Sequence, residues 1–467
     1  MNKESFNIQG LGGAKTLKGT IQINGAKNAA LKAMAAAVLF DGPVELHNIP
    51  DTEDIHTMTE ILEKLGAQVT HGASVKIDPT NIDATTIDPK LAAIMRASIV
   101  LTGSLLARYG RVTFPAPGGC VIGARPIDQF LKGYEKMGAV VTENDCSYAI
   151  EFGGQGEEDP GSLGLVAGGM IRDPRVKKDI TIDFEMITVG GTETLMMAAV
   201  LGNGTVTLNN CAQEPEIVNV AEWLNECGAH ISGAGTDTIK VRGTAGKLLS
   251  PTTPYTAIPD RIEAGSYLIL GALCAEQLTI ENCRPDHLKV LIDLLIQSGV
   301  PIKIYNGDVG NGRDGSISII GNTKPNAMFR PFDVSTREYP GFPTDLQAQI
   351  VTYLTQVTGK STVVENIFEG RFKYIDDLQR IGAGVTLDSS SKVSITGPRE
   401  LRVAGNVANT TNLLAHDIRA GFAIVMAALV AEGIFTVSNV YFIDRGYEKM
   451  EEKLRALGAK IDRVQSR

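Results

Sequence analysis

Six stretches of the chain are apolar on almost every face that a helix would present. They are rich in alanine and in large aliphatic residues, and several of them open with charged residues. A helix that is hydrophobic all round belongs in a protein interior. The sequence therefore predicts six buried helices, at residues 27–40, 95–109, 191–201, 261–275, 345–357 and 417–431.

A second pattern follows each stretch: a β-branched strand ending in Asn or a small residue, a loop, an amphipathic helix, a Gly-Ala step and another strand. In the first copy Met58, Ile61, Leu62 and Leu65 recur at helical spacing, and Gly66 supplies the stop. We therefore predict six α/β units, each with one buried helix, one surface helix and short strands. The copies begin at Val44, Val112, Val206, Leu278, Ser361 and Phe435.

The length of the chain and a proline-rich segment divide these units into two halves. The 467 residues exceed the roughly 250 to 300 at which single cores stop growing. The Pro-rich segment 251–260 predicts a linker between the third and fourth units. A strand predicted at 16–25 and the C-terminal segment 458–464 suggest that the chain ends meet in one sheet. We expect domains comprising residues 26–258 and residues 1–25 plus 259–467.

Composition narrows the classes of function. The formal net charge of −9 and the pI near 5.4 argue against a binder of nucleic acid or membrane surfaces, so any anion site must be local. No apolar run reaches the roughly 18 to 20 residues of a membrane span, and no signal peptide is evident, so a cytoplasmic protein is expected. Six cysteines without CxxC spacing predict neither disulfides nor a zinc site.

Charged and polar residues stand at the starts of the otherwise apolar buried helices. A helix N-terminus carries a partial positive charge, so a Lys or Arg there is unfavourable unless an anion binds between them. Repetition in equivalent places favours a shared anion site. The residues are Lys27 and Asn28, Arg96, Thr188 to Thr192, Asp260 and Arg261, Asp345, and Asp417 and Arg419.

A second equivalent place, the loop before the surface helix, holds Arg125, Arg371 and Arg445. Arginine can bind a carboxylate or phosphate through two parallel hydrogen bonds. Each of these residues alone is normally a solvated or ion-paired arginine. Together with the helix starts, the three favour a functional anion site.

Two further residues have both a structural and a catalytic interpretation. Cys120 lies in a Pro- and Gly-rich loop, where it is either an incidental thiol or, with Arg125 five residues on, a thiolate that exchanges protons near neutral pH. Asp345 follows Phe-Pro-Thr at a helix start and is either a cap or a general base directed at a substrate hydroxyl.

At these residues the chain resembles the enolpyruvyl transferases, and within them the enzymes that act on UDP-N-acetylglucosamine. The resemblance covers nearly the full length. It implies an α/β fold of two inside-out domains, each built from three repeated units around a closed core of helices. The motifs that carry it are INGAKNAAL, MRASI, PGGCVIGARPID, EPEIV, PDRIEAG, FPTDLQAQ, ENIFEGRF, HDIRAG and IDRGYEKMEEKLRALGA.

The resemblance implies transfer of the enolpyruvyl group of phosphoenolpyruvate to the 3-hydroxyl of UDP-N-acetylglucosamine, with release of phosphate, as the first committed step of peptidoglycan synthesis. It implies that Cys120 protonates the methylene carbon and that Asp345 takes the hydroxyl proton. It requires no metal or organic cofactor, and it leaves the oligomeric state open. Phosphoenolpyruvate would contact Lys27, Arg96, Arg125, Arg419 and Arg445, and the substrate-binding set also includes Asn28, Pro126, Ile127, Asp128, Thr188, Val189, Gly190, Asp345, Ile367 and Arg371.

The sequence departs from the family at several points. Acidic residues at 51–54 and Met186 stand where lysines are common, and the segments from Gly153 and Lys324 look like inserted surface loops. Three rivals remain: the sister enzyme acting on shikimate 3-phosphate, a silent paralogue that only binds sugar nucleotide, and a nucleic-acid end-processing enzyme. The cysteine loop disfavours the first, retention of the catalytic candidates the second, and the lack of a basic groove the third.

Overall fold

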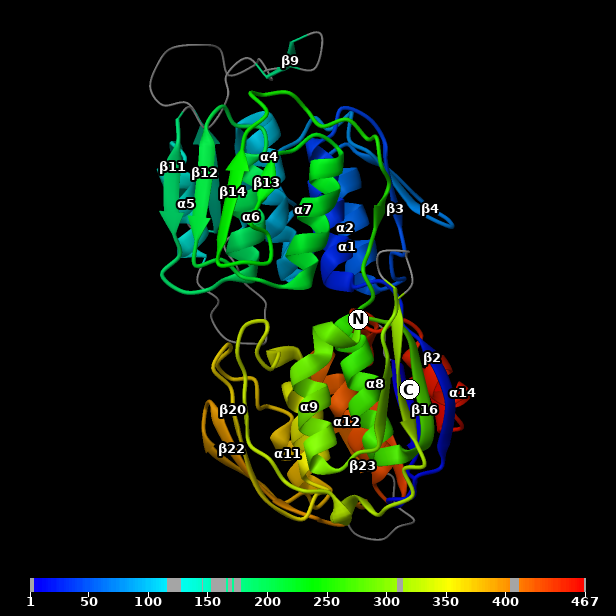
Figure 1. Cartoon of the computed structure of the whole chain (residues 1–467). Coiled ribbons are helices and arrows are strands. Elements are labelled where there is room, and N and C mark those ends of the chain that lie inside the picture. The colour runs from blue at the N-terminus through cyan, green and yellow to red at the C-terminus, as the bar shows by residue number, and fades with distance from the viewer. Residues whose placement is uncertain are drawn as a thin grey trace. The chain divides into compact units, whose positions relative to one another are not determined.

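The computed structural model describes residues 4–115, 127–144, 146–152, 165–166, 170–171, 178–308, 314–403 and 411–465 (Figure 1). Within the described residues the chain forms two compact units. We call the residues from Gly25 to Ile258 the central unit, and the residues up to Asn24 together with those from Pro259 onward the terminal unit.

Each unit has three buried helices at its core. In the central unit they are α1 (Lys27–Ala36), α4 (Leu101–Tyr109) and α6 (Val189–Ala199), and in the terminal unit α8 (Arg261–Cys274), α10 (Gln347–Leu354) and α12 (Ile418–Val430). All six predicted buried helices are therefore confirmed. Two begin with a 3₁₀ turn, η2 (Arg96–Val100) before α4 and η6 (Thr344–Leu346) before α10.

Each of the six repeats contributes one sheet, and five of the six sheets share the same strand pairing. An outer strand runs parallel to its neighbour, and two further strands continue antiparallel. The terminal unit has the sheets β2 (Leu17–Gln22), β16 (Ala275–Cys283), β18 (Gly315–Ile320), β17 (Ile302–Tyr305); β19 (Val334–Ser335), β20 (Gly359–Val364), β22 (Lys392–Gly397), β21 (Val385–Ser389); and β23 (Thr411–Leu414), β24 (Ile434–Ser438), β1 (Glu4–Gln9), β25 (Lys460–Gln465).

The central unit repeats this pairing. In its second sheet a single parallel bridge, from Thr86 to Thr113, replaces the outer strand. A separate short ribbon pairs β9 (Leu165–Val166) with β10 (Met170–Ile171). The sheets are β15 (Tyr255–Thr256), β3 (Val44–His47), β5 (Val75–Asp78), β4 (Gln68–His71); β6 (Arg111–Pro115), β8 (Ser147–Phe152), β7 (Ala139–Asn144); and β11 (Ile180–Asp183), β12 (Thr205–Asn209), β14 (Thr238–Arg242), β13 (Ile231–Ser232).

The amphipathic helices also occur where the repeat predicts them. The Gly after each adopts the left-handed conformation that ends a helix, with φ between 97° and 108° at residues 66, 138, 228, 299, 382 and 458. The predicted stop is thus confirmed in every copy. These helices are α2 (Glu53–Lys64), α5 (Asp128–Lys136), α7 (Pro215–Glu226), α9 (Lys289–Ser298), α11 (Ile375–Arg380), and the pair α13 (Tyr441–Asp444) and α14 (Met450–Ala456), while α3 (Pro89–Ile94) lies outside the pattern.

The Asn that closes the main strand of a unit has a structural role. In four copies its side-chain amide donates to a backbone carbonyl just beyond the parallel outer strand, the segment that leads into a buried helix. The pairs are Asn48 to Ala257, Asn210 to Phe184, Asn282 to Ile23 and Asn366 to Thr336. Because site candidates lie at the starts of those helices, these hydrogen bonds fix the backbone that carries them.

In both units the helices are gathered inside and the sheets lie outside (Figure 1). The fold is therefore the inside-out α/β architecture of two domains with six repeats. No helix in the described part of the chain is long and apolar enough to cross a membrane.

Three expectations about segments need correction. The chain ends do meet in one sheet, where the C-terminal β25 pairs with β1, but the strand predicted at 16–25 is β2 and pairs with β16 instead. The segment 251–260 is more than a linker, because β15 within it joins the sheet of β3. The segment from Lys324 is more than a surface loop, because it contains β19 and the fully buried Thr336.

Candidate active site

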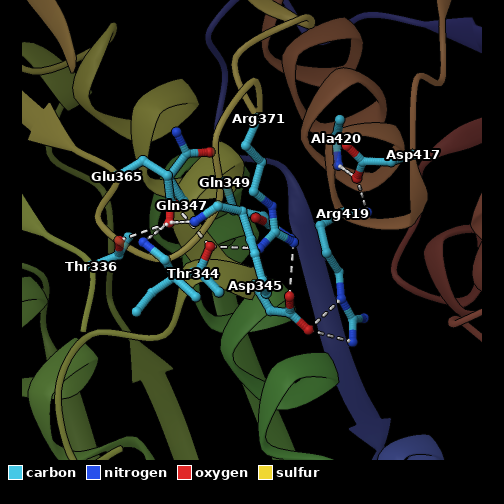
Figure 2. Close-up of polar contacts among 12 residues, drawn as sticks. Thr336, Thr344, Asp345, Gln347, Gln349, Glu365, Arg371, Asp417, Arg419 and Ala420 are labelled. Atoms are coloured by element: carbon cyan, nitrogen blue, oxygen red, sulfur yellow. Dashed lines mark hydrogen bonds and ion pairs between the residues drawn. The ribbon is translucent and has the colours of Figure 1, made fainter. Parts of the chain in front are cut away.

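Asp345 stands at the centre of a buried ion cluster in the terminal unit (Figure 2). It lies in η6, directly before α10. Its Oδ1 accepts a hydrogen bond from Nη2 of Arg371 at 2.8 Å, and its Oδ2 accepts one from Nε of Arg419 at 3.1 Å. The side chains of Arg371 and Arg419 are only 4% and 5% exposed, whereas that of Asp345 is 26% exposed. The Asp345 carboxylate is therefore the part of the cluster that solvent can reach.

Arg419 is positioned by the first turn of α12. The Asp417 side chain caps this helix by accepting from the backbone N–H groups of Arg419 and Ala420 at 2.8 and 2.9 Å. The guanidinium lies over the ring of Tyr447, 5.2 Å from its centroid. Its Nη1 is buried and has no hydrogen-bond partner among the described residues. Nε and Nη2 of Arg419 thus face Asp345, whereas Nη1 lies on the buried side of the guanidinium.

Arg371 is held just as firmly. Its Nη1 donates to the hydroxyl of Thr344, and its guanidinium lies 5.4 Å from the ring centroid of Phe368. Burial opposes the charge on Arg371, but the carboxylates of Asp345 and Asp417 outweigh it, so the pKa of Arg371 is raised. The cluster thus keeps two fixed positive charges beside one carboxylate.

Arg445 and Ile367 belong to the same unit but to other segments. Arg445 is half-buried at the C-terminal end of α13, next to Asp444, which forms two hydrogen bonds with Arg463, each at 2.8 Å. The backbone N–H of Ile367 donates to Glu365.

The central unit holds a second buried pair. Lys27, the first residue of α1, forms an ion pair with Asp54 in the first turn of α2 at 2.8 Å, and both side chains are at most 7% exposed. One helical turn further, Lys32 pairs with Glu193 of α6 at 3.2 Å. Burial raises the pKa of Glu193 to about 7.

The remaining candidates of the central unit lie at helix starts, as the sequence predicts. Arg96 begins η2 and is half-buried. Thr188 caps α6 by accepting from the N–H of Gly191 at 3.2 Å, and Val189 and Gly190 form its first turn. Asn28 follows Lys27 in α1, and Ile127 and Asp128 begin α5. Cys120, Arg125 and Pro126 lie outside the described residues.

Sequence patterns missed several residues that build these clusters. The sequence shows Asp54 only as part of an acidic stretch and does not reveal its pairing with Lys27. Nothing in the sequence marks Thr344 or Glu365. Glu365 directly precedes the Asn that ends the main strand of its repeat. The residues at the same position in other repeats are His47, Asn209 and Glu281. In the described part of the chain no three His, Cys, Asp or Glu side chains are arranged to hold a metal ion.

The inside-out fold of repeated α/β units is that of a class of protein, the enolpyruvyl transferases. The solved structures that the chain resembles are of this class. The enolpyruvyl transferase NikO from Streptomyces tendae superposes with a TM-score of 0.79 at 22% identity over all of both chains. An EPSP synthase from Acinetobacter baumannii does so with a TM-score of 0.68 at 16% identity, over 99% of this chain and 100% of that one.

Sequence comparison gives the family directly. A family model described as EPSP synthase (3-phosphoshikimate 1-carboxyvinyltransferase) matches residues 11–454, and the chain belongs to this family. Within it, UDP-N-acetylglucosamine 1-carboxyvinyltransferase 3 of Caldanaerobacter subterraneus is 40% identical, with 99% of both chains covered. The UDP-N-acetylglucosamine 1-carboxyvinyltransferase of Koribacter versatilis is 42% identical, with 97% of this chain and 95% of the relative covered.

Proposed function

We propose that this protein transfers the enolpyruvyl group of phosphoenolpyruvate to the 3-hydroxyl of UDP-N-acetylglucosamine and releases phosphate. The observation that carries the proposal is the near full-length identity of about two residues in five to relatives named for this transfer. The cluster of Asp345, Arg371 and Arg419 supports it, because the reaction needs a carboxylate base near fixed positive charge.

The chemistry divides into addition and elimination. In the addition, a proton is delivered to the methylene carbon of phosphoenolpyruvate, and the acceptor oxygen bonds to the adjacent carbon while its own proton passes to a base. In the elimination, a methyl proton leaves and the bond to phosphate breaks, which restores the double bond. We assign the proton on carbon to Cys120 and the hydroxyl proton to Asp345.

The ion cluster explains how substrate could prepare the base. In the unliganded protein Arg371 and Arg419 both donate to Asp345, so these hydrogen bonds occupy lone pairs that would otherwise accept the proton of a substrate hydroxyl. An anionic substrate that binds the Nε and Nη2 donors of Arg419 would compete with Asp345 for this guanidinium. Asp345 would then accept a proton only when substrate is bound, which protects the unliganded protein from unproductive proton transfer.

The other candidates complete the substrate contacts in this proposal. Lys27, Arg96, Arg125 and Arg445 balance the phosphate and carboxylate charges of phosphoenolpyruvate together with Arg419. Lys27 must exchange Asp54 for the substrate anion in the same way as Arg419 exchanges Asp345. The sugar nucleotide contacts Asn28, Thr188, Val189, Gly190, Ile367 and Arg371, and the segment Arg125 to Asp128.

Product analysis tests the proposal. The purified full chain is incubated with phosphoenolpyruvate and either UDP-N-acetylglucosamine or shikimate 3-phosphate, and the products are identified by mass spectrometry. We expect the enolpyruvyl ether of UDP-N-acetylglucosamine and no modified shikimate 3-phosphate. An enolpyruvyl ether of shikimate 3-phosphate alone would overturn the acceptor assignment, and absence of both ethers would overturn the proposed reaction.

A further inference from the structure

Glu365 lies beside the ion cluster and has no part in the proposed chemistry. It follows β20 directly, and only 3% of it is exposed. Its Oε1 accepts hydrogen bonds from the Thr336 hydroxyl at 3.0 Å and from the backbone N–H groups of Ile367 and Phe368 at 2.9 and 3.1 Å. Its Oε2 accepts one from the Thr344 hydroxyl at 2.8 Å. A buried carboxylate is tolerated because donors of this kind surround it.

Three of the four donors belong to segments that carry candidate site residues, and Figure 2 shows Thr344 between Glu365 and Arg371. Thr344 immediately precedes Asp345 in η6. Ile367 is a predicted contact of the sugar nucleotide, and the ring of Phe368 lies against the guanidinium of Arg371. One carboxylate therefore joins the turn that bears the proposed base to the loop that bears the proposed acceptor contacts.

The Thr344 hydroxyl connects Glu365 to Arg371. A hydroxyl has one proton to donate and lone pairs with which to accept. Because its proton points to Oε2 of Glu365, its oxygen offers a lone pair to Nη1 of Arg371. With Nη1 fixed there, Nη2 is directed at Oδ1 of Asp345 at 2.8 Å. The orientation of Arg371 thus depends on a charge that does not touch it.

We infer that Glu365 is a positioning residue of this enzyme. Its carboxylate fixes the Thr344 hydroxyl, the hydroxyl orients Arg371 toward Asp345, and the same carboxylate holds the loop at Ile367. The inference rests on the proposed function, because the positioned groups are its base and its acceptor contacts.

The test uses the isosteric substitution Glu365→Gln. The amide oxygen can keep the three donors on one side, but the amide nitrogen then faces Thr344 and donates where a carboxylate oxygen accepted. The Thr344 proton must then turn away from residue 365 toward the side of Nη1 of Arg371, which weakens the hydrogen bond that orients Arg371. We expect kcat/KM for UDP-N-acetylglucosamine to fall roughly 10- to 100-fold, the size of effect that loss of a charged hydrogen bond produces.

Two comparisons separate positioning from simple stability. Thr344→Val should lose a similar factor, Thr344→Ser should retain activity, and the double variant Glu365→Gln/Thr344→Val should be no worse than either single variant. Glu369→Gln is the matched control, because Glu369 is exposed in the same loop and loses the same charge. It should behave as the wild type.

Turnover of Glu365→Gln equal to the wild type, or losses that multiply in the double variant, would overturn the inference. If the wild-type protein forms no enolpyruvyl UDP-N-acetylglucosamine, the proposed function fails instead. Crystal structures of the wild type and Glu365→Gln then decide the inference on geometry alone. We expect the Arg371 guanidinium to leave the Thr344 hydroxyl in the variant, and an unmoved guanidinium would contradict us.

Discussion

At the scale of single residues, the protein places charges where burial makes each of them costly. Arg371, Arg419, Lys27 and Lys32 are almost fully buried, and each is paired with a carboxylate. Removing one partner of a buried pair is strongly destabilising because it leaves an uncompensated charge. Such pairs are retained where the charge is needed, and three of these four cations stand among the residues assigned to substrate.

Asp345→Asn tests the assignment of the base. The amide keeps the size of the side chain and can still accept from one arginine, but it cannot take a proton. We expect kcat to fall by about 100- to 10,000-fold, the usual contribution of a general base, with a much smaller change in KM. Steady-state kinetics with both substrates measures this. A change confined to KM would leave Asp345 as a binding residue.

Cys120→Ala tests the proton donor. The substitution should abolish product formation and leave the thermal unfolding of the protein unchanged, because the loop around Cys120 is predicted to be exposed. Cys120→Asp should remain active, since a carboxyl group also delivers protons, and should resist alkylation by fosfomycin, which we expect to modify Cys120 in the wild type. Normal turnover of Cys120→Ala would refute the role of this thiol.

Glu193 predicts a pH dependence of stability. Its pKa rises from 4.5 to about 7 on folding, so the folded protein binds this proton more tightly and loses stability as pH increases across that window. Glu193→Gln removes the effect, so the stability of the variant relative to the wild type should increase by up to about 3 kcal/mol between pH 4.5 and 7. Urea unfolding at both pH values measures it. If the free energy of unfolding differs between Glu193→Gln and the wild type by the same amount at both pH values, the raised pKa of Glu193 is contradicted.

At the scale of elements, short caps and turns determine where the charged groups lie. Asp417 ends the loop before α12 and fixes the backbone of Arg419. Asp345 lies in the 3₁₀ turn η6, which directly precedes α10. The buried helices themselves present few polar side chains. Their N-terminal turns therefore hold the candidate residues, and the remainder of each helix packs in the core.

Removal of the cap on α12 tests this view. Asp417→Ala should cost about 1 kcal/mol in the free energy of unfolding and should also weaken phosphoenolpyruvate binding, because Arg419 loses its fixed backbone. Asn225→Ala removes a side chain that accepts from the backbone N–H of Ile231, in a segment without candidate residues, and should affect only stability. Chemical unfolding and KM measurements distinguish the two. Equal KM values in both variants would separate the cap from the site.

The repeats explain which elements the sequence predicts well. All-round apolar helices, amphipathic helices and their terminal glycines are local patterns, and six copies reinforce one another. Strand pairing is not local. The two-residue strands β15 and β19 have no period that could reveal them, and their place follows from side-chain amides of residues far away, such as Asn48 and Asn366.

The candidate residues divide in the same way. Arg371, Arg419 and Asp345 follow from repeated positions. Glu365 and Thr344 act through hydrogen bonds between segments, and no pattern in the sequence indicates them.

At the scale of the whole molecule, an acidic chain carries a local concentration of buried cations. The net charge of −9 leaves solvent-exposed surfaces unattractive to polyanions, whereas the arginine cluster is desolvated and hydrogen-bonded in place. Small anionic substrates of defined shape suit such a site better than extended ones do.

The rate of phosphate release tests the central claim most directly. The purified full chain is assayed with phosphoenolpyruvate alone, with UDP-N-acetylglucosamine added, and with shikimate 3-phosphate added, alongside Asp345→Asn under the same conditions. We predict phosphate release that requires UDP-N-acetylglucosamine and nearly disappears in the variant. Phosphate release that is independent of the sugar nucleotide, or that needs shikimate 3-phosphate, would contradict the function proposed for this protein.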